Sequence, residues 1–174
     1  MMMQGIPSYF SLLVLSAVLT LLPFLVVTTT SFAKISVVLF LVRNALGIQQ
    51  TPPGILLNTV AIVLTLYIMA PVLKDVYGIL LAPNATYATV QDWERTAIEA
   101  TRPLKTFLAT HSRPEAKEFF VETTAKLWKG HATLTVSADD MLILMPAFLV
   151  SELTRAFEIG FLLYLPFLVV DFVV

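Results

Sequence analysis

The sequence predicts an all-α protein in which membrane-associated helical hairpins carry a small polar helical insert. Of its 174 residues, 57% are hydrophobic and 13% are charged, whereas soluble domains average about 45–50% and about 25%. The charges are also segregated, because eight of the 11 Lys and Arg and nine of the 12 Asp and Glu lie within residues 74–140. Two nearly uncharged flanks around a polar middle are typical of a membrane protein with a polar insert outside the bilayer.

The first hydrophobic helix is expected at the amino end. No charged residue occurs from Met1 to Phe32, and Tyr9 to Val27 is an apolar run of about the ~20 residues that cross a bilayer core. A cleaved signal peptide is the alternative. It is less favoured, because the amino end has no Lys/Arg region and no small-x-small cleavage pattern follows the run.

The second hydrophobic helix is expected from Ile55 to Leu73, another uncharged run of one membrane thickness. Pro52 and Pro53 stand just before it. A proline lacks an N–H and has a fixed φ, so both suit the start of a helix. Residues 1–73 therefore read as two hydrophobic helices.

The connection at residues 34–54 carries only two charges, Lys34 and Arg43, and both are positive. By the positive-inside rule this connection faces the cytoplasm. The segment after Leu73 is then expected on the opposite side of the membrane, which makes residues 74–140 an extracytoplasmic polar domain.

Two helices are expected in this polar domain. Gln91 to Thr110 and Pro114 to Lys129 carry helical patterns, and the stretches 82–84 and 130–136 read as loops. Four large apolar side chains of the second helix are candidates for its buried face: Phe119, Phe120, Leu127 and Trp128.

The third hydrophobic segment, residues 141–174, is too long for one straight crossing. Ser137 or Asp139 is expected to cap its first turn. Three residues within it allow kinks or a break: Pro146, Gly160 and Pro166.

A charged cluster interrupts this third segment. Glu152, Arg155 and Glu158 are spaced i, i+3 and i+6, so they spread over about 120° of a helix circumference. Because a charge in the bilayer centre costs at least ~2.5–3.5 kcal/mol, each needs a partner: one another, Lys34, Arg43 or a neighbouring subunit. An ion or proton path is one interpretation. An ionic lock between helices or subunits is favoured, because the group is nearly self-neutralising and lacks the lone acid of a proton relay.

The composition excludes several functions. A net charge of −1 and a pI near 6.1 give no sign of nucleic-acid binding. Without cysteine there is no disulfide, thiol nucleophile or cysteine metal site. His111 and His131 show no metal-ligand spacing, and no catalytic or phosphate-binding motif occurs. We therefore expect no enzyme, no catalytic residue, no metal and no cofactor.

Three strings together resemble a known family. They are TSFAKISVVLFLVRNALGIQQTPP at Thr30–Pro53, MAP at Met69–Pro71, and PAFLVSELTRAFEIGF at Pro146–Phe161, which is followed by LPFLVVD. This pattern is similar to the FliP/SctR family, the inner-membrane export-apparatus proteins shared by flagellar and virulence type III secretion systems. The amino end resembles the injectisome branch more than the flagellar branch.

The resemblance implies a function that the residue patterns alone do not. Members of this family assemble as homopentamers that join proteins of the SctS/FliQ and SctT/FliR families in a helical cone in the bacterial inner membrane. That cone is the entry portal for unfolded secreted proteins, and residues 74–140 would lie on its periplasmic side. In the assembly the hydrophobic hairpins are largely lifted out of the bilayer plane and packed on neighbouring subunits.

Both charged regions match the family's motifs, Lys34 and Arg43 in the first and Glu152, Arg155 and Glu158 in the third. The resemblance thus implies subunit contacts there. The alternative function is a small ion-coupled transporter or proton-conducting subunit. Transporters usually show internal repeats, and none is visible in this sequence.

The sequence departs from the family at its carboxyl end. The family continues past the position of Asp171 into a further apolar hairpin half, with a methionine-rich stretch that closes the pore. Here the sequence stops at Val174. We expect this to be a truncation, with the second hairpin half missing from the sequence.

Overall fold

The computed structural model describes residues 7–47, 52–83, 85–129 and 136–173, and within these ranges all regular secondary structure is helical. The predicted all-α class is confirmed. Six helices follow one another along the described chain: α1 (Pro7–Thr29), α2 (Phe32–Ala45), α3 (Gly54–Leu80), α4 (Val90–His111), α5 (Pro114–Leu127) and α6 (Met141–Val173).

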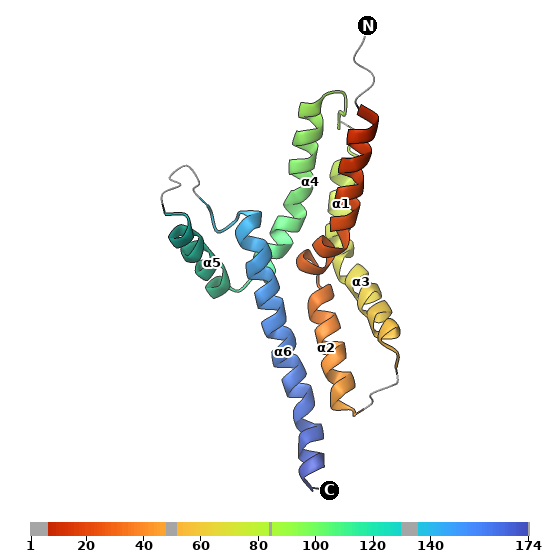
Figure 1. The fold of residues 1–174 in the computed structure, drawn as a ribbon, viewed down its shortest axis with the longest axis vertical. Helices are drawn as coiled ribbons and strands as arrows, with labels where there is room; N and C mark the ends of the chain where they lie inside the picture. Colours follow the sequence, from red (N-terminus) through yellow and green to blue (C-terminus); the bar gives the residue numbers. More distant parts are fainter. Residues whose placement is uncertain (1–6, 48–51, 84, 130–135, 174) are drawn as a thin grey trace.

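The helices form an elongated arrangement with two levels (Figure 1). The upper level holds α1, α4 and the carboxyl-terminal half of α3. The lower level holds α2, the amino-terminal half of α3 and most of α6. α5 projects to one side near the middle. The most extensive helix pair is α2 with α6, and α3 packs mainly on α4 and α2.

A sharp bend of 68° separates α1 from α2. Three successive threonines precede it, and the hydroxyls of Thr28 and Thr29 donate to the carbonyls of Phe24 and Leu25 at 2.9 and 2.7 Å. Such back-bonding competes with the backbone ladder and bends helices. From the sequence, residues 34–54 are expected to be a connection without a helix of its own. Much of it is α2, a 14-residue helix.

Two helices are long and apolar enough to cross a membrane, Gly54–Leu80 and Met141–Val170, and a third span results if the bent pair α1–α2 counts as one. Pro53 is the residue directly before α3, and its carbonyl accepts a hydrogen bond from the N–H of Leu56 at 2.9 Å. Pro52 lies one residue earlier, outside the helix. Pro146 and Pro166 both lie inside α6, which remains one continuous helix over its described length.

The first turn of α6 differs from the expectation. Its first backbone bonds run from the N–H groups of Ile143 and Leu144 to the carbonyl of Asp140, at 2.9 and 2.8 Å. Asp140 also accepts the Ser137 N–H on its carboxylate at 2.7 Å. Asp140 is therefore the residue that organises the helix start, and the cap predicted at Ser137 or Asp139 is wrong by position.

α4 begins with a reciprocal capping box. The Thr89 hydroxyl accepts from the Asp92 N–H at 3.1 Å, and the Asp92 carboxylate accepts from the Thr89 N–H at 3.0 Å. Hydrogen bonding of the Asp92 carboxyl to the Thr89 side chain, and then to the Thr89 N–H, lowers the pKa of this carboxyl below its ordinary value of 3.8. The box satisfies two N–H groups that a helix start otherwise leaves without a partner.

We predict that Thr89→Ala destabilises the protein by about 1 kcal/mol, because the helix start loses a capping hydroxyl. The contribution of the Asp92 charge has a defined pH dependence. Because the folded state lowers this pKa, the stabilisation is complete above pH 3.8 and is lost as the pH falls through the lowered pKa. Thermal unfolding between pH 3 and 7 tests both points. Asp92→Asn should remove the part of the acid-induced loss of stability that this carboxyl causes. If the dependence of Tm on pH did not change in this variant, the assignment to Asp92 would be contradicted.

The hydrophobic core is small and lies where the two levels meet. Met69 of α3, Phe107 and Leu108 of α4, and Leu144 and Phe148 of α6 form one buried cluster. The rings of Phe107 and Phe148 are 5.6 Å apart and tilted. This cluster holds α4 and the start of α6 against α3 and so positions the charged residues that follow on α6.

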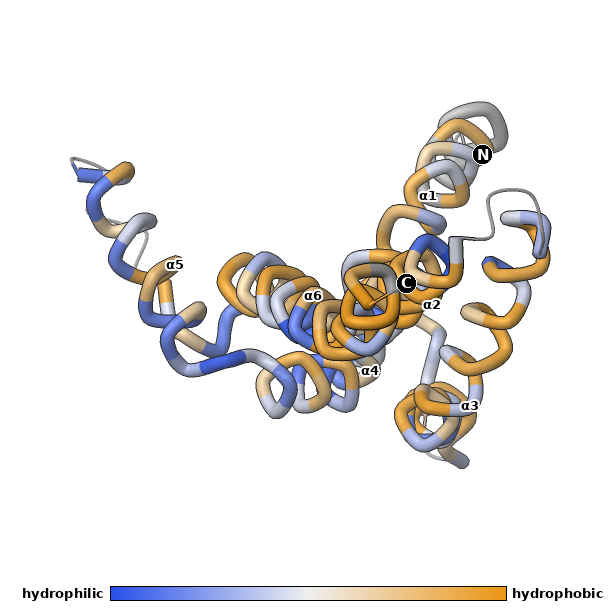
Figure 2. The backbone as a smooth tube through the Cα atoms, turned by 90° about the horizontal axis from the view of Figure 1, so that it is seen from below, coloured by the Kyte–Doolittle hydropathy of each residue, from blue (hydrophilic) through white to orange (hydrophobic). Residues whose placement is uncertain are grey.

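The predicted buried face of α5 is wrong for this chain. None of the residues of α5 is buried, and Phe119 and Leu127 are 61% and 75% exposed. Phe120 and Trp128 are half-buried. The physical reason is that α5 packs mainly on α6 and projects away from the rest of the molecule (Figure 2). The loop expected at residues 130–136 lies almost wholly outside the described residues, as does His131.

Candidate functional site: an ionic junction on α6

Glu152 is the centre of the charged cluster on α6. Its side chain is fully buried, and its two oxygens face two different cations. The Lys34 ammonium of α2 lies 2.7 Å from Oε2, within ion-pair distance although not aligned for a hydrogen bond. The Arg155 guanidinium, one turn further along α6, donates to Oε1 at 3.0 Å. Glu152 therefore links α6 to the first turn of α2.

Arg155 connects α6 to the end of α4. Besides Glu152, its guanidinium donates to the carbonyl oxygen of His111 at 2.8 Å. The His111 ring packs on Phe107 at 4.3 Å, and its Nδ1 lies 2.8 Å from the Phe107 carbonyl. The His111 ring thus packs against Phe107, and the His111 carbonyl accepts a hydrogen bond. The Arg155 cation lies at the carboxyl end of α4, where the helix dipole favours a positive charge.

Glu158 contacts a third element, the corner between α4 and α5. Both of its oxygens accept from the Arg113 guanidinium at 2.7 Å. The Arg113 backbone N–H also donates to the Ser151 hydroxyl of α6 at 2.9 Å. The residue that precedes α5 is therefore fixed to α6 by its side chain and by its backbone.

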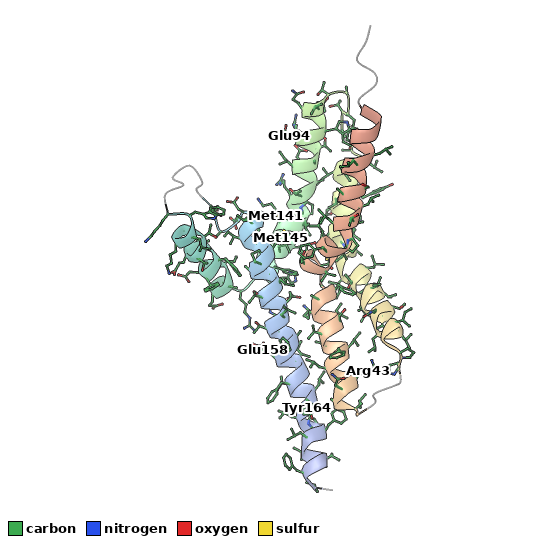
Figure 3. All side chains as sticks on the ribbon, in the orientation of Figure 1. Arg43, Glu94, Met141, Met145, Glu158 and Tyr164 are labelled. Atoms are coloured by element: carbon green, nitrogen blue, oxygen red, sulfur yellow. The ribbon has the colours of Figure 1, made fainter. Side chains whose placement is uncertain are left out.

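The spacing on α6 explains this three-way pattern. Residues three and six positions apart spread over about 120° of the helix, so Glu152 faces Lys34 of α2 while Glu158 faces Arg113 at the α4–α5 corner. Figure 3 shows Glu158 on the α5 side of α6. We name the five residues of this site the ionic junction: Lys34, Arg113, Glu152, Arg155 and Glu158.

Arg43, also predicted for this cluster, lies elsewhere. It belongs to the last turn of α2, nine residues after Lys34 and so about 13 Å further along the helix axis. Figure 3 shows it beyond α2, on the side of α3. Glu152 is paired with Lys34 and Arg155, and the structure brings Arg43 to neither glutamate of the junction by a described ion pair.

Sequence reasoning missed Arg113. Its partner is 45 positions away, and nothing in the local pattern links the two. The one sequence signal for Arg113 is its position directly before Pro114, as the last residue before the start of a helix. A cation at a chain corner can reach across to a neighbouring helix, but only the packing of α4 on α6 decides which one.

We predict that Arg113→Ala lowers stability by at most about 1 kcal/mol, the range of partly exposed ion pairs. The Arg113 and Glu158 side chains are 35% and 54% exposed, and the backbone bond to Ser151 survives the substitution. Arg95→Ala is the matched control, since the Arg95–Glu99 pair is more exposed and should give no measurable change. A loss of several kcal/mol in thermal unfolding of Arg113→Ala would mean that this pair is more deeply enclosed than the geometry indicates.

The junction can hold helices together but has little chemistry to offer. Its one buried carboxylate is neutralised by two cations. Within the described ranges, no group of three His, Cys, Asp or Glu side chains could hold a metal ion. The arrangement is that of a structural tie between α2, α6 and the α4–α5 corner.

Comparison with known proteins adds independent information. Residues 15–174 match the model of the FliP family. The chain is 48% identical over 97% of its length to the probable translocation protein y4yL of Sinorhizobium fredii and covers 76% of that protein. It is 43% identical over 99% of its length to Yop proteins translocation protein R of Yersinia pestis, covering 79%. It is 40% identical over 99% of its length to the hypersensitivity response secretion protein HrcR of Ralstonia nicotianae, covering 80%.

Proposed function

Because the chain belongs to the FliP family of type III secretion export proteins, we propose that it is a channel-forming subunit of the export gate. In this proposal it provides part of the inner-membrane entry portal for unfolded secreted proteins. It assembles as a homopentamer with proteins of the SctS/FliQ and SctT/FliR families. Residues 74–140 lie on the periplasmic side, and the protein has no enzymatic activity of its own.

One observation carries the proposal of a subunit. Ten hydrophobic residues in the described chain are buried, and five of them form the core cluster. Large apolar side chains are exposed along α1, α3 and the second half of α6. Soluble monomers rarely expose apolar patches larger than a few hundred Å². A chain with so little core of its own is stable only when lipid or other subunits cover these helices.

The ionic junction supports a scaffold more than an ion path. Glu152 is fully buried and is held between two cations, Lys34 of α2 and Arg155 of α6, which is the arrangement of a tie between helices. The transporter alternative therefore has no observation in its favour. A liposome ion flux that disappeared in Glu152→Gln, with protein export unaffected, would revive it.

The native mass of the detergent-extracted protein tests the proposal. We expect a pentamer when the protein is expressed alone, and a larger mixed complex when the two partner proteins are co-expressed. Multi-angle light scattering or native mass spectrometry gives the subunit number directly. A monomer or dimer under both conditions would contradict the proposed assembly.

A further inference from the structure

A proline lies inside each helix of the hairpin that α3 and α4 form. Pro71 is inside α3, and Pro103 is inside α4. Because a proline has no N–H, the carbonyls four positions earlier, those of Tyr67 and Glu99, lose their helical donors. The proline ring also presses on that carbonyl, and sharp bends of helices are commonly found at such residues. Each helix of the hairpin is therefore weakest at its proline.

The two weak points lie at the same level of the hairpin. Pro71 and Pro103 both line one groove of about 490 Å³ between α3 and α4. Close to Pro103, the Thr101 hydroxyl donates to the carbonyl of Ile98 at 2.7 Å, and such back-bonding also bends helices. Figure 1 shows α3 running obliquely in the lower level and closer to the long axis in the upper level. Both helices of the hairpin can therefore bend at one height.

Burial changes at the two prolines. Three residues of each helix are buried, and on the far side of the prolines from the core only Thr96 is among them. We call this far part the hairpin tip, the described residues 72–83 and 85–102. α4 meets α6 in the core cluster, on the other side of Pro103, so the two helices of the tip rest mainly on each other. Five of the six buried residues lie on the core side: Ala61, Thr65, Met69, Phe107 and Leu108.

The hairpin tip is tied together by its own contacts. The Tyr87 hydroxyl donates to the carbonyl of Leu80 at the end of α3. The rings of Tyr87 and Trp93 lie 4.7 Å apart, which connects the same turn to α4. The capping box of Thr89 and Asp92 fixes the first turn of α4. These bonds all lie within the tip, so they persist when the tip changes its angle to the core.

We propose that the hairpin tip pivots as one body about Pro71 and Pro103. A hinge consists of a few residues that absorb the backbone change between two rigid parts, here the tied tip and the core cluster. One pivot in each helix makes the line through both prolines the axis, so the tip tilts out of the plane of the hairpin. The groove beside the prolines supplies the space that a close-packed interior would deny. This hinge belongs to the hairpin of a single chain and does not depend on the proposed function.

Pulsed electron–electron double resonance between two nitroxides measures the spread of tip positions. Because the sequence contains no cysteine, Glu94→Cys on the tip and Phe40→Cys on α2 give one labelled pair, the tip pair. The control pair joins Phe40→Cys to Leu142→Cys on α6, and these two side chains are 56% and 57% exposed. It crosses Pro146 of α6 and neither proline of the hinge. Doubly labelled copies are diluted among unlabelled ones in the detergent-extracted protein, expressed alone and with the partner proteins.

We expect the distance distribution of the tip pair to be at least twice as wide as that of the control pair. Pro71→Ala/Pro103→Ala returns both N–H donors and should narrow it to the width of the control. Pro23→Ala, which changes a proline inside α1, should leave it unchanged. Circular dichroism of these variants verifies that the helices have formed.

Two results would overturn the hinge. One is a tip pair no wider than the control pair in both preparations, and the other is an unchanged width in the double-alanine variant. A wide distribution in the protein alone that narrows in the complex would support the hinge and show that assembly fixes its angle. A monomer with a wide distribution would uphold the hinge while contradicting the proposed pentamer.

Hydrogen exchange distinguishes a pivoting body from a tip that unfolds. In a pivot, the amides at residues 76–80 and 94–98 keep their helical hydrogen bonds. We expect them to exchange at least tenfold more slowly than in an unfolded chain of the same sequence. Exchange at the unfolded rate throughout the hairpin tip would overturn the proposal, because a tip without structure of its own cannot pivot as one body.

Discussion

Lys34→Met is expected to destabilise the packing of α2 on α6 by about 3 kcal/mol, at the lower end of the cost of breaking a buried ion pair. Glu152 is fully buried, and the Lys34 ammonium is the cation nearest to Oε2, at 2.7 Å. Without it, the carboxylate remains buried and retains only Arg155. Methionine keeps most of the aliphatic volume of lysine, so the loss reports the charge and not a cavity.

Substitution of the anion instead of the cation should reduce the stability of the protein by less. Glu152→Gln removes the buried charge itself and preserves the shape of the side chain. Lys34 and Arg155, whose side chains are 25% and 34% exposed, can then turn toward water. We expect a loss of about 1–2 kcal/mol, typical of hydrogen bonds to charged groups. The double variant Lys34→Met/Glu152→Gln should be close to Glu152→Gln alone, since no buried charge is left without a partner.

Thermal unfolding of the detergent-solubilised protein measures this asymmetry. For a chain of this size, 1 kcal/mol corresponds to about 2–4 °C in Tm, so Lys34→Met should unfold about 6–12 °C lower than the natural protein. Equal losses for the two single variants would show that Glu152 reaches solvent. Arg155→Ala extends the series, because it removes the second cation and the bond to the His111 carbonyl at the same time. We expect it to impair assembly together with stability.

The sequence made the helices of the polar segment predictable because their signals are local. The expected Gln91–Thr110 and the observed Val90–His111 differ by one residue at each end, since capping and periodicity act within a few positions. α2 was not anticipated. Its Ile35, Val37, Val38 and Val42 are β-branched and lower helix propensity, and contact with α6 outweighs that preference.

The candidate site was predictable only in part for a related reason. The i, i+3, i+6 spacing placed Glu152, Arg155 and Glu158 on one broad face, and it left their partners open. Whether Glu158 meets Arg155 or Arg113 depends on where the α4–α5 corner lies, and the core between Phe107 and Phe148 determines that position. Local sequence carries no record of such a distant pairing. The exposure of α5 was missed because a pattern cannot say whether a partner is part of the same chain.

Gly160→Ala is expected to destabilise the α2–α6 contact by about 1–3 kcal/mol, the usual cost of overpacking. Gly160 is buried on α6, and an added Cβ there would lie 2.2 Å from Cδ1, 3.1 Å from Cβ and 3.2 Å from Cγ of Leu41 on α2. Rotation of the Leu41 side chain relieves the first contact. It cannot relieve the contact with the Leu41 Cβ, so the helices must separate slightly. Small residues that allow close helix approach are typical of helix pairs in membranes, and buried Ala156 lies one turn earlier.

A loss of stability in Gly160→Ala would be informative, because helix propensity alone favours alanine over glycine. Within a helix, alanine is about 1 kcal/mol more favourable than glycine, so the clash must outweigh that gain. Gly78→Ala on α3 is the matched control, since nothing lies within 4 Å of an added Cβ there, and it should leave Tm unchanged or raise it. Leu41→Ala removes the clashing side chain, so Gly160→Ala should cost less in that background than in the natural one. If the two substitutions were simply additive in Tm, the separation of α2 and α6 would not be set by the contact between Gly160 and Leu41. A positive coupling energy between the two substitutions would place the closest approach of α2 and α6 at Gly160, eight residues after Glu152. Gly160 and the buried Glu152 carboxylate would then together fix the position of α2 on α6.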